Sequence, residues 1–315
     1  MNKVLSLAYF AGGSKFTLDP FIALKNSKHD LKIAFTKSPK RAGRGKKKSY
    51  NLLLEKAVEF GIPIKTIDDF KNIENLKLLK NLELDFIVVF SFGLILPKEV
   101  LEIPRYGCIN IHASLLPKWR GASPVQHVLM NNDSVTGYTL IVMNEKLDEG
   151  DIVYKEEVII DKSDNYASLL DKIVNLASKD LVKKIENLGN NVIKTETQVH
   201  SEASYCYKIK KEDTYLNFDT TAKAVLGKVR ALSPIPGAKC YLSGELIKII
   251  EAEVEDNNTT NKKTGCVIDE NLLISCKRGF IRLMKIQRAG RRVMMAKELL
   301  NGWKIKIGTI INEKK

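Results

Sequence analysis

The sequence predicts an α/β protein in which a Rossmann-like domain is followed by a small β-barrel domain. The first two thirds alternate short apolar runs with helical patterns, which is typical of a parallel sheet flanked by helices. The last third offers several short strand candidates separated by Gly, Asn and Asp turns, as small barrels do. A length of 315 residues also exceeds the usual single domain of about 100–200 residues.

The elements of the first domain follow from apolar spacing. Residues 4–9, 31–36 and 85–90 predict strands, and the continuous apolar run in the last of these indicates burial on both faces. Residues 50–60 have helical spacing and end at a Gly-Ile-Pro sequence. Behind a cap at Asp164, apolar residues repeat at helical spacing, which predicts a long amphipathic helix that closes this domain near residue 189.

We therefore expect a catalytic domain over residues 1–189, a polar linker over 190–207 and a second domain over 208–315. The second domain begins with a helix around residues 222–232 and a Pro-rich turn. Five strand candidates follow, at residues 239–242, 246–254, 265–268, 272–276 and 281–287. Five short strands with such turns favour an OB-like barrel of the kind that binds nucleic acid.

Charge points to a polyanionic partner. The formal net charge is +14, and residues 201–315 carry 22 Lys and Arg against 13 Asp and Glu. Such an excess favours nucleic acid through counterion release, although a lysine-rich composition also serves solubility, and charge alone does not decide between the two. No apolar run of about 18 residues is present, so we expect a cytoplasmic protein without membrane association. The five cysteines lack a C-x-x-C pair, which predicts free thiols and no metal site.

Two polar side chains share one face of a predicted strand. In residues 107–112 the alternation of a strand places Asn110 and His112 together, at the carboxyl end of a sheet where open α/β folds bind ligands. Asp148 follows another strand candidate, residues 138–143, on a loop that can fold back over this edge. An amide, an imidazole and a carboxylate would then converge. By residue type alone, satisfied structural polar groups are the commoner explanation.

The motifs around these residues resemble those of the folate-dependent formyltransferases. The run from Asn110 to Pro124 (NIHASLLPKWRGASP), followed by LDEGD at residues 147–151, carries the resemblance, and its RGASP tail is similar to the methionyl-tRNA branch. Residues 92–97 (FGLILP) resemble the folate-side loop of the family, and residues 231–238 the start of its C-terminal barrel. The likeness extends over nearly the whole chain, with a Rossmann-like formyltransferase domain and an OB-like domain.

The resemblance implies transfer of the formyl group of 10-formyltetrahydrofolate to the amine of methionyl initiator tRNA. It gives the catalytic roles to Asn110, His112 and Asp148. Attack on the formyl carbon develops negative charge on the formyl oxygen, which Asn110 and a protonated His112 would stabilise as hydrogen-bond donors. Asp148 would favour the charged imidazole and, through a bound water, would relay the proton that the attacking amine loses. The reaction needs no covalent intermediate and no metal.

Folate-side residues are implied in two loops. They are Phe92, Gly93, Leu94 and Ile95, together with Ser114, Leu115, Leu116 and Pro117. Two of them have a second interpretation. Phe92, where the family usually has tyrosine, lines the pteridine pocket or packs in the core, and Ser114 is more typical of local turn chemistry than of a donor.

Two basic segments are the implied tRNA surface. Residues 37–48 hold seven Lys or Arg in twelve positions and resemble the loop with which the family clasps the acceptor stem. The implied contacts there are Lys40, Arg41, Arg44, Lys46 and Lys47, with Arg44 in the position of the specificity arginine. The second domain has a basic belt, in which the implied contacts are Arg282, Arg288 and Arg291; its other members are Lys277, Arg278, Lys285 and Arg292. A solvated surface loop is the alternative for residues 37–48.

The sequence departs from the family at residues 11–16, where AGGSKF replaces the usual Gly-Thr-Pro loop. Two other functions stay open: formylation of a small amine such as a purine precursor or amino sugar, and a noncatalytic RNA-binding module. The basic segments argue against the first, and the retained polar triad against the second. We expect a monomer, with His127 on a helix in a structural role and His29 and His200 at the surface.

Overall fold

The computed structural model describes residues 3–39, 41–42, 47–48, 51–259 and 262–312. For residues 41–42, 47–48 and 257–259 it describes the backbone alone. The chain forms two compact units, which are described separately below. Unit 1 contains residues 1–122, 136–158 and 170–205, and unit 2 contains residues 123–135, 159–169 and 206–315. The contiguous division at residues 189 and 208 stays a prediction.

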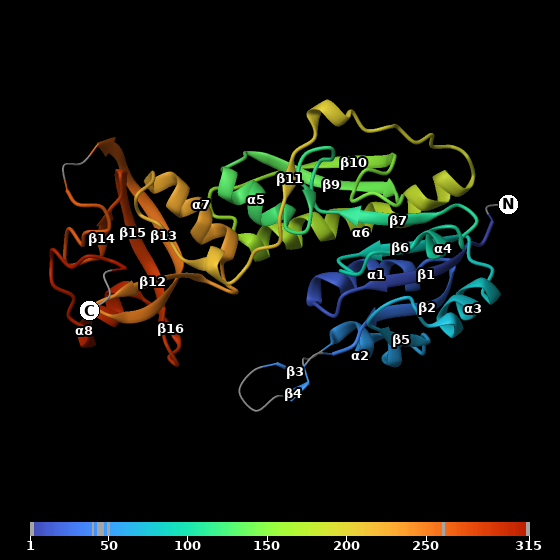
Figure 1. The fold of residues 1–315 in the computed structure, drawn as a ribbon, viewed down its shortest axis with the longest axis horizontal. Helices are drawn as coiled ribbons and strands as arrows, with labels where there is room; N and C mark the ends of the chain where they lie inside the picture. Colours follow the sequence, from blue (N-terminus) through green and yellow to red (C-terminus); the bar gives the residue numbers. More distant parts are fainter. Residues whose placement is uncertain (1–2, 40, 43–46, 49–50, 260–261, 313–315) are drawn as a thin grey trace. The chain divides into compact units, whose positions relative to one another are not determined.

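Unit 1 is built on a seven-stranded sheet (Figure 1). In spatial order its strands are β10 (Ile152–Ile159), β9 (Val135–Val142), β7 (Cys108–His112), β6 (Phe86–Phe90), β1 (Ser6–Ala11), β2 (Asp30–Lys37) and β5 (Ile64–Ile67). The pairs from β7 to β5 are parallel, whereas β9 runs antiparallel to β7. The predicted parallel sheet is confirmed, and it carries an antiparallel edge.

Both faces of this sheet are covered, as the continuous apolar strands require. Ala8 and Phe10 of β1 pack in a buried cluster with side chains from α3 (Ile73–Asn81) and α4 (Lys98–Leu101). The alternate residue Tyr9 contacts Phe21 of α1 (Leu18–Lys25) from the other face, with 5.7 Å between ring centroids. Helix α6 (Tyr166–Gly189) covers this second face near β9, where Tyr138 donates a hydrogen bond to Asp180 at 2.6 Å.

Two helix starts follow from local hydrogen bonding. The Asn51 side chain accepts from the Leu54 N–H at 3.0 Å and so caps α2 (Leu52–Glu59). At α6 the predicted cap is wrong by one residue. Asn165 accepts from the Ala167 and Ser168 N–H groups at 2.9 and 3.1 Å, whereas Asp164 binds the Asp161 N–H and the Ser168 hydroxyl.

The loops that follow β1 and β6 meet at the carboxyl edge of the parallel strands. A Cβ on Gly12 would lie 2.8 Å from the Ser91 carbonyl oxygen, so only glycine permits this approach of the two backbones. The loop that follows β7 leaves from the same edge. These loops therefore surround one region of the sheet, as open α/β folds require for a ligand site.

Unit 2 has one sheet with the strand order β12-β13-β15-β14, and β16 pairs with β15 (Figure 1). These strands are β12 (Ala238–Leu242), β13 (Glu245–Thr259), β14 (Leu273–Ser275), β15 (Arg278–Arg288) and β16 (Val293–Met295). The strand predicted at residues 265–268 is wrong, because Cys266 and Val267 form only isolated bridges. Pairing of β13, β14 and β16 with β15 makes it the centre of the sheet, but an OB-like barrel stays a prediction.

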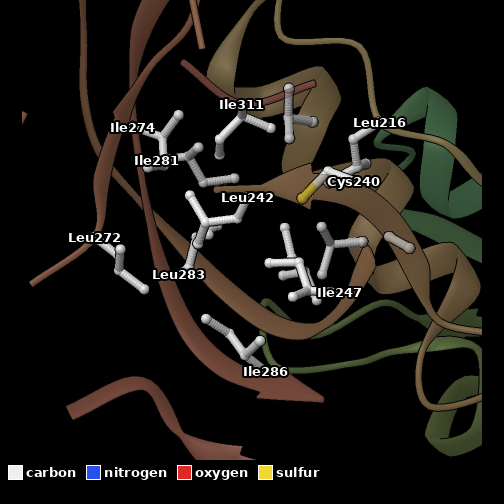
Figure 2. Packing of buried hydrophobic residues seen from close by; sticks show 14 of the residues in the cluster. Leu216, Cys240, Leu242, Ile247, Leu272, Ile274, Ile281, Leu283, Ile286 and Ile311 are labelled. Atoms are coloured by element: carbon white, nitrogen blue, oxygen red, sulfur yellow. The ribbon is translucent and has the colours of Figure 1, made fainter. Parts of the chain in front are cut away.

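The core of unit 2 is aliphatic. Figure 2 shows side chains of β12, β13, β14 and β15 pointing together, among them Leu242, Ile247, Ile274 and Leu283, each fully buried. Helix α7 (Ala222–Leu232) is capped by Thr221 and contributes Val225 and Val229 to this cluster. Gly227 of α7 lies against α5 (Pro124–Asn131), where a Cβ would be 2.7 Å from the Leu129 carbonyl oxygen. Unit 2 also contains α8 (Ala296–Gly302).

The histidine and cysteine predictions had mixed outcomes. The surface prediction for His29 is wrong: its Nδ1 accepts from the Leu5 N–H at 3.2 Å, its Nε2 lies 3.0 Å from Glu186, and burial lowers its pKa. His127 lies on α5 as predicted, and His200 is exposed. All five cysteines are free thiols, and burial raises the pKa of Cys108 to about 12. Among the described residues, no helix is long and apolar enough to cross a bilayer.

Candidate active site

Asn110 and His112 lie on one face of β7, near the carboxyl end of that strand. Their neighbours in the antiparallel strand β9 are Ile141 and Thr139. Asn110 is half-buried and His112 is 5% exposed. The predicted alternation is therefore confirmed: the two polar groups share a face, while Ile109 and Ile111 are buried on the other.

Asp148 reaches the same place from the loop between β9 and β10. Because β9 is antiparallel to β7, this loop starts beside the amino end of β7 and must fold back. Its backbone adopts φ +53° at Asp148, a left-handed conformation that Asp tolerates better than most residues. Asp148 Oδ1 accepts from the Asn110 amide at 3.4 Å, and Oδ2 lies 3.6 Å from His112 Nδ1. The structure thus brings the three predicted catalytic side chains together.

The Asp148 carboxylate is held by backbone as well. Its Oδ2 accepts the Gly121 N–H at 2.9 Å, a charge-assisted bond stronger than a neutral one. Asn110 has two amide hydrogens, so its contact with Asp148 occupies only one of them. The second is available to a substrate oxygen, which gives this site a polarising donor beside a fixed carboxylate.

The His112 ring lies between two acceptors. Its Nε2 is 2.9 Å from the Trp119 carbonyl oxygen, and Nδ1 faces Asp148. A doubly protonated imidazole would have an acceptor for each N–H, whereas a neutral ring would satisfy only one. Both ring nitrogens of His112 therefore face oxygen atoms.

The loop after β7 has a fixed conformation. It contains a cis peptide between Leu116 and Pro117, and Trp119 has φ +62°. The Ser114 hydroxyl donates to the Lys118 carbonyl at 2.6 Å, which is the local turn role weighed for it above. The Thr139 hydroxyl donates to the Ser114 carbonyl at 2.7 Å and accepts from the Leu116 N–H at 3.0 Å. These bonds tie the loop to β9.

An arginine and a glutamine complete this region, and the sequence did not single out either of them. Arg120 is fully buried, with its Nη1 3.3 Å from Glu149, and Gln198 is 4% exposed. Arg120 lies inside the run that carried the resemblance, which is the one signal that could have drawn attention to it. Gln198 lies in a segment whose polar composition predicted only a linker.

The implied folate-side residues differ in exposure. Phe92 and Leu116 are buried, and Phe92 packs between Phe10 and Phe70 with centroid distances of 5.4 and 6.1 Å. Ile95 is 87% exposed. The others, Gly93, Leu94, Leu115 and Pro117, are exposed or half-buried. Gly93 also offers its carbonyl oxygen to Lys37 Nζ, which ties the loop after β6 to β2.

The basic loop is only partly described. Lys40, Arg44 and Lys46 lie outside the described residues. The backbones of Arg41 and Lys47 belong to a two-stranded hairpin of β3 (Arg41–Ala42) and β4 (Lys47–Lys48). Their role in RNA contact stays a prediction.

The basic belt of unit 2 is paired in part with acidic side chains. Arg282 hydrogen-bonds to Glu255 and to Asp269, and these bonds raise its pKa above the ordinary range. Arg288 forms a bidentate pair with Glu245 at 2.6 and 3.0 Å. Arg291 is exposed, and no ion pair of its side chain is seen within the described part of the chain. Charge on this belt is therefore less available than its sequence suggests.

No group of three or more His, Cys, Asp or Glu side chains that could hold a metal ion occurs within the described ranges. The carboxylate, amide and imidazole of the site are instead bonded to one another and to backbone. What this arrangement offers a substrate is a hydrogen-bond donor, a carboxylate and a polarised ring within one small region.

Comparison with known proteins identifies two family matches. Residues 6–185 match the family "Formyl transferase", and residues 208–304 match "Formyl transferase, C-terminal domain". A methionyl-tRNA formyltransferase of Thermodesulfovibrio yellowstonii is 34% identical over 301 residues, which is 95% of this chain and 96% of that protein. One from Legionella pneumophila, strain Paris, is 38% identical over 304 residues, with the same coverages.

Solved structures share the fold. An N-formyltransferase from Helicobacter canadensis, in complex with folinic acid and dTDP-3-aminofucose, has a TM-score of 0.64 and 20% identity, covering 91% of this chain and 100% of that one. HypX from Aquifex aeolicus in complex with tetrahydrofolic acid has a TM-score of 0.64 and 15% identity, covering 97% and 50%. At these identities the likeness concerns the fold alone.

Proposed function

This chain belongs to the formyl transferase family, and from that membership we propose that it formylates the amine of methionyl initiator tRNA with 10-formyltetrahydrofolate as donor. The product is formylmethionyl-tRNA for translation initiation. Support for the acceptor comes from curated relatives at 34–38% identity that span about 95% of the chain and are named methionyl-tRNA formyltransferase.

The observation that carries the catalytic part is the convergence of Asn110, His112 and Asp148. Asp148 follows His112 and Asn110 by 36 and 38 residues along the chain, yet its carboxylate lies within 3.6 Å of both side chains. A surface role would not require a carboxylate to be folded back over the sheet and held by the Gly121 N–H. Acyl transfer to an amine does require such a group beside a donor.

Each side chain then has a defined task. The free N–H of Asn110 donates to the formyl oxygen, on which negative charge develops during attack. His112, between Trp119 and Asp148, adds positive charge beside that oxygen when it is protonated. Asp148 accepts the proton that the attacking amine must lose, directly or through one water. The donor brings the activated formyl group, and the protein supplies orientation and charge.

The donor would lie along the loops that follow β6 and β7. The half-buried Leu94 and Leu115 offer apolar surface there, and the backbone of Gly93 and Ile95 offers hydrogen-bonding groups. The buried side chains of Phe92, Ser114 and Leu116 would shape this surface from below. Pro117 would fix the path of the second loop. This assignment rests on the likeness of these loops to the family.

The acceptor would be held by basic residues in both parts of the chain, with Arg41, Arg44 and Lys47 among those of the first. Arg291 would contribute in the second part. Arg282 and Arg288 would contribute after displacement of their acidic partners, or as members of an ion pair that stays intact and has no net charge. We place the protein in the cytoplasm as a monomer, with a catalytic domain, linker and RNA-binding domain at the predicted boundaries.

Formylation of an amino sugar is the second candidate. It is favoured by one observation: a sugar 3N-formyltransferase, WlaRD, and an N-formyltransferase in complex with dTDP-3-aminofucose share this fold, with TM-scores of 0.65 and 0.64 over more than nine tenths of the chain. Their identities of 22% and 20% are lower than those of the tRNA enzymes, and the net charge of +14 has no purpose with a small acceptor.

The test is a formylation assay with radiolabelled donor and three acceptors: methionyl initiator tRNA, methionyl elongator tRNA and a nucleotide-linked amino sugar. We expect rapid label transfer to the initiator tRNA alone. Transfer to the sugar and not to tRNA would overturn the proposed acceptor, and transfer to none would overturn the activity. The Asp148→Asn protein is the matched negative control.

A further inference from the structure

Residues 196–204 of unit 1 make hydrogen bonds to both loops of the candidate active site. Glu196 forms an antiparallel bridge with Ile152, with N–H to oxygen bonds of 2.7 and 2.8 Å, just beyond the Asp148 loop. Ser204 accepts the Arg120 N–H at 2.8 Å through its carbonyl and the Trp119 N–H at 2.9 Å through its hydroxyl. A segment with the composition of a linker therefore spans the two loops.

Gln198 lies in the middle of this segment, and its side chain is buried. Its Nε2 donates to the carbonyl oxygens of Asp148 and Gly150, at 2.9 and 2.7 Å. Its Oε1 accepts from Arg120 Nε and Nη2, at 3.1 and 2.8 Å. One carboxamide thus joins the loop that carries Asp148 to the residue that precedes Gly121.

The hydrogen-bonding capacity of this carboxamide is fully used, with two donors and two acceptor positions occupied. Its orientation is also determined, because a guanidinium only donates and a carbonyl only accepts. A flipped amide would place NH2 against Arg120 and oxygen against two carbonyl oxygens. Gln198 consequently fixes the backbone on both sides of Glu149 in one arrangement.

We propose that Gln198 is a positioning residue for the reaction. It acts through Asp148, since it holds the left-handed backbone at that residue and, through Arg120, the strand from which the Gly121 N–H binds the carboxylate. It does not itself touch the reacting atoms. The proposal rests on the proposed function, but its structural part is independent of the acceptor that the enzyme uses.

The best single change is Gln198→Glu, which keeps the shape and the bonds to Arg120 but replaces both donors with a carboxylate oxygen. Gln198→Met removes the whole carboxamide without adding charge. Thr197→Ala is the matched control, because Thr197 is the adjacent residue and its side chain is exposed. We expect kcat to fall by up to about 100-fold in the Gln198 variants while KM for both substrates changes little, because misplacement of a reacting group acts on the rate of the chemical step.

A double-mutant cycle separates positioning from general structural damage. If Gln198 acts through Asp148, Gln198→Glu should lower kcat by less than about 3-fold in the Asp148→Asn background. An undiminished fall in that background, or a wild-type kcat in Gln198→Glu, would overturn the proposal. Loss of fold in both Gln198 variants would assign the residue a purely structural role and overturn it as well.

A crystal structure of the Gln198→Glu protein decides the same question without reference to activity. We expect the Asp148 carboxylate to leave the Gly121 N–H, from which it is 2.9 Å in the wild-type protein. An unmoved carboxylate would refute the inference even if the enzyme formylates tRNA. Conversely, a displaced carboxylate would support it even if the true acceptor is another amine, so failure of the proposed function is distinguishable.

Discussion

Replacement of Arg120 by methionine should destabilise unit 1 strongly, because the guanidinium is fully buried and Gln198 and Glu149 are among the groups that it contacts. Gln198 Oε1 would lose both of its donors, and an unsatisfied buried acceptor costs about 1–3 kcal/mol. Glu149 would lose its pair, which costs about 3–5 kcal/mol for a fully buried partner. Glu149 is 20% exposed and keeps Lys146 at 3.7 Å, so its share is smaller.

Together these effects amount to about 3–4 kcal/mol, or a fall in Tm of about 6–16 °C for a unit of this size. Thermal unfolding followed by circular dichroism on the full chain measures the shift. Arg105→Met is the matched control, because Arg105 is exposed and lies over the Tyr106 ring, 5.1 Å from its centroid. That change should cost less than about 1 kcal/mol. Equal Tm values for the two variants would refute the assignment of Arg120 as a buried structural cation.

Other predictions concern rate, RNA affinity and pH. Asp148→Asn should lower kcat by about 100-fold or more while the Kd for methionyl-tRNA in a filter-binding assay stays near that of the wild type; a near-normal kcat would contradict its role. Arg291→Ala should weaken tRNA binding and reduce its salt dependence more than Arg288→Ala, because Arg288 is already paired with Glu245, and the reverse order would show that the pair opens on binding. Hydrogen bonding to Arg288 lowers the pKa of Glu245 below 4.5, so the stability gained from this pair is present at neutral pH and lost as the pH falls through the folded pKa. Glu245→Gln should therefore flatten the acid limb of a stability-against-pH curve, and an unchanged limb would exclude this pair as a contributor. Burial and the bond to Asp180 raise the pKa of Tyr138. Its phenolate absorbance should therefore not appear in an alkaline pH titration before the protein unfolds, and comparison with Tyr138→Phe would test this.

The parts of the fold that the sequence predicted are those with strong local periodicity. Continuous apolar runs placed β1, β2 and β6 within two residues of their observed bounds, because strands buried on both faces leave no polar position. The helix α6 was predicted from a different local pattern, the apolar residues that repeat at helical spacing along one face. The strand at residues 265–268 failed because β propensity does not decide whether a partner strand is present.

Strand alternation predicted only the part of the candidate site that lies on a single strand. Asn110 and His112 share a strand, so their common face followed from period two. The approach of Asp148 depends on a loop that reverses beside an antiparallel strand, and here the resemblance, not periodicity, indicated the outcome. His29 illustrates the opposite limit, since its burial arises from contacts with Leu5 and Glu186 that are distant in sequence.

Charge counts have a similar limit in the basic belt. The sequence shows a surplus of Lys and Arg in residues 201–315 but not their partners. In the folded protein Arg282 pairs with Glu255 and Asp269, and Arg288 pairs with Glu245; solvent-accessible pairs of this kind each contribute little to stability. What such pairs do change is the charge available to phosphates, so net charge overstates the cationic surface that RNA would meet.

Gln198 could not be predicted from local periodicity, and its contacts are with residues that are distant in sequence. A glutamine in a polar segment carries no periodic signal, and its three partner residues, Asp148, Gly150 and Arg120, are 48 to 78 residues away in sequence. Yet a buried carboxamide with every donor and acceptor used tolerates almost no substitution, because any replacement leaves at least one buried group unsatisfied. The segment that sequence composition described as a linker is therefore part of the framework that holds the loop carrying Asp148.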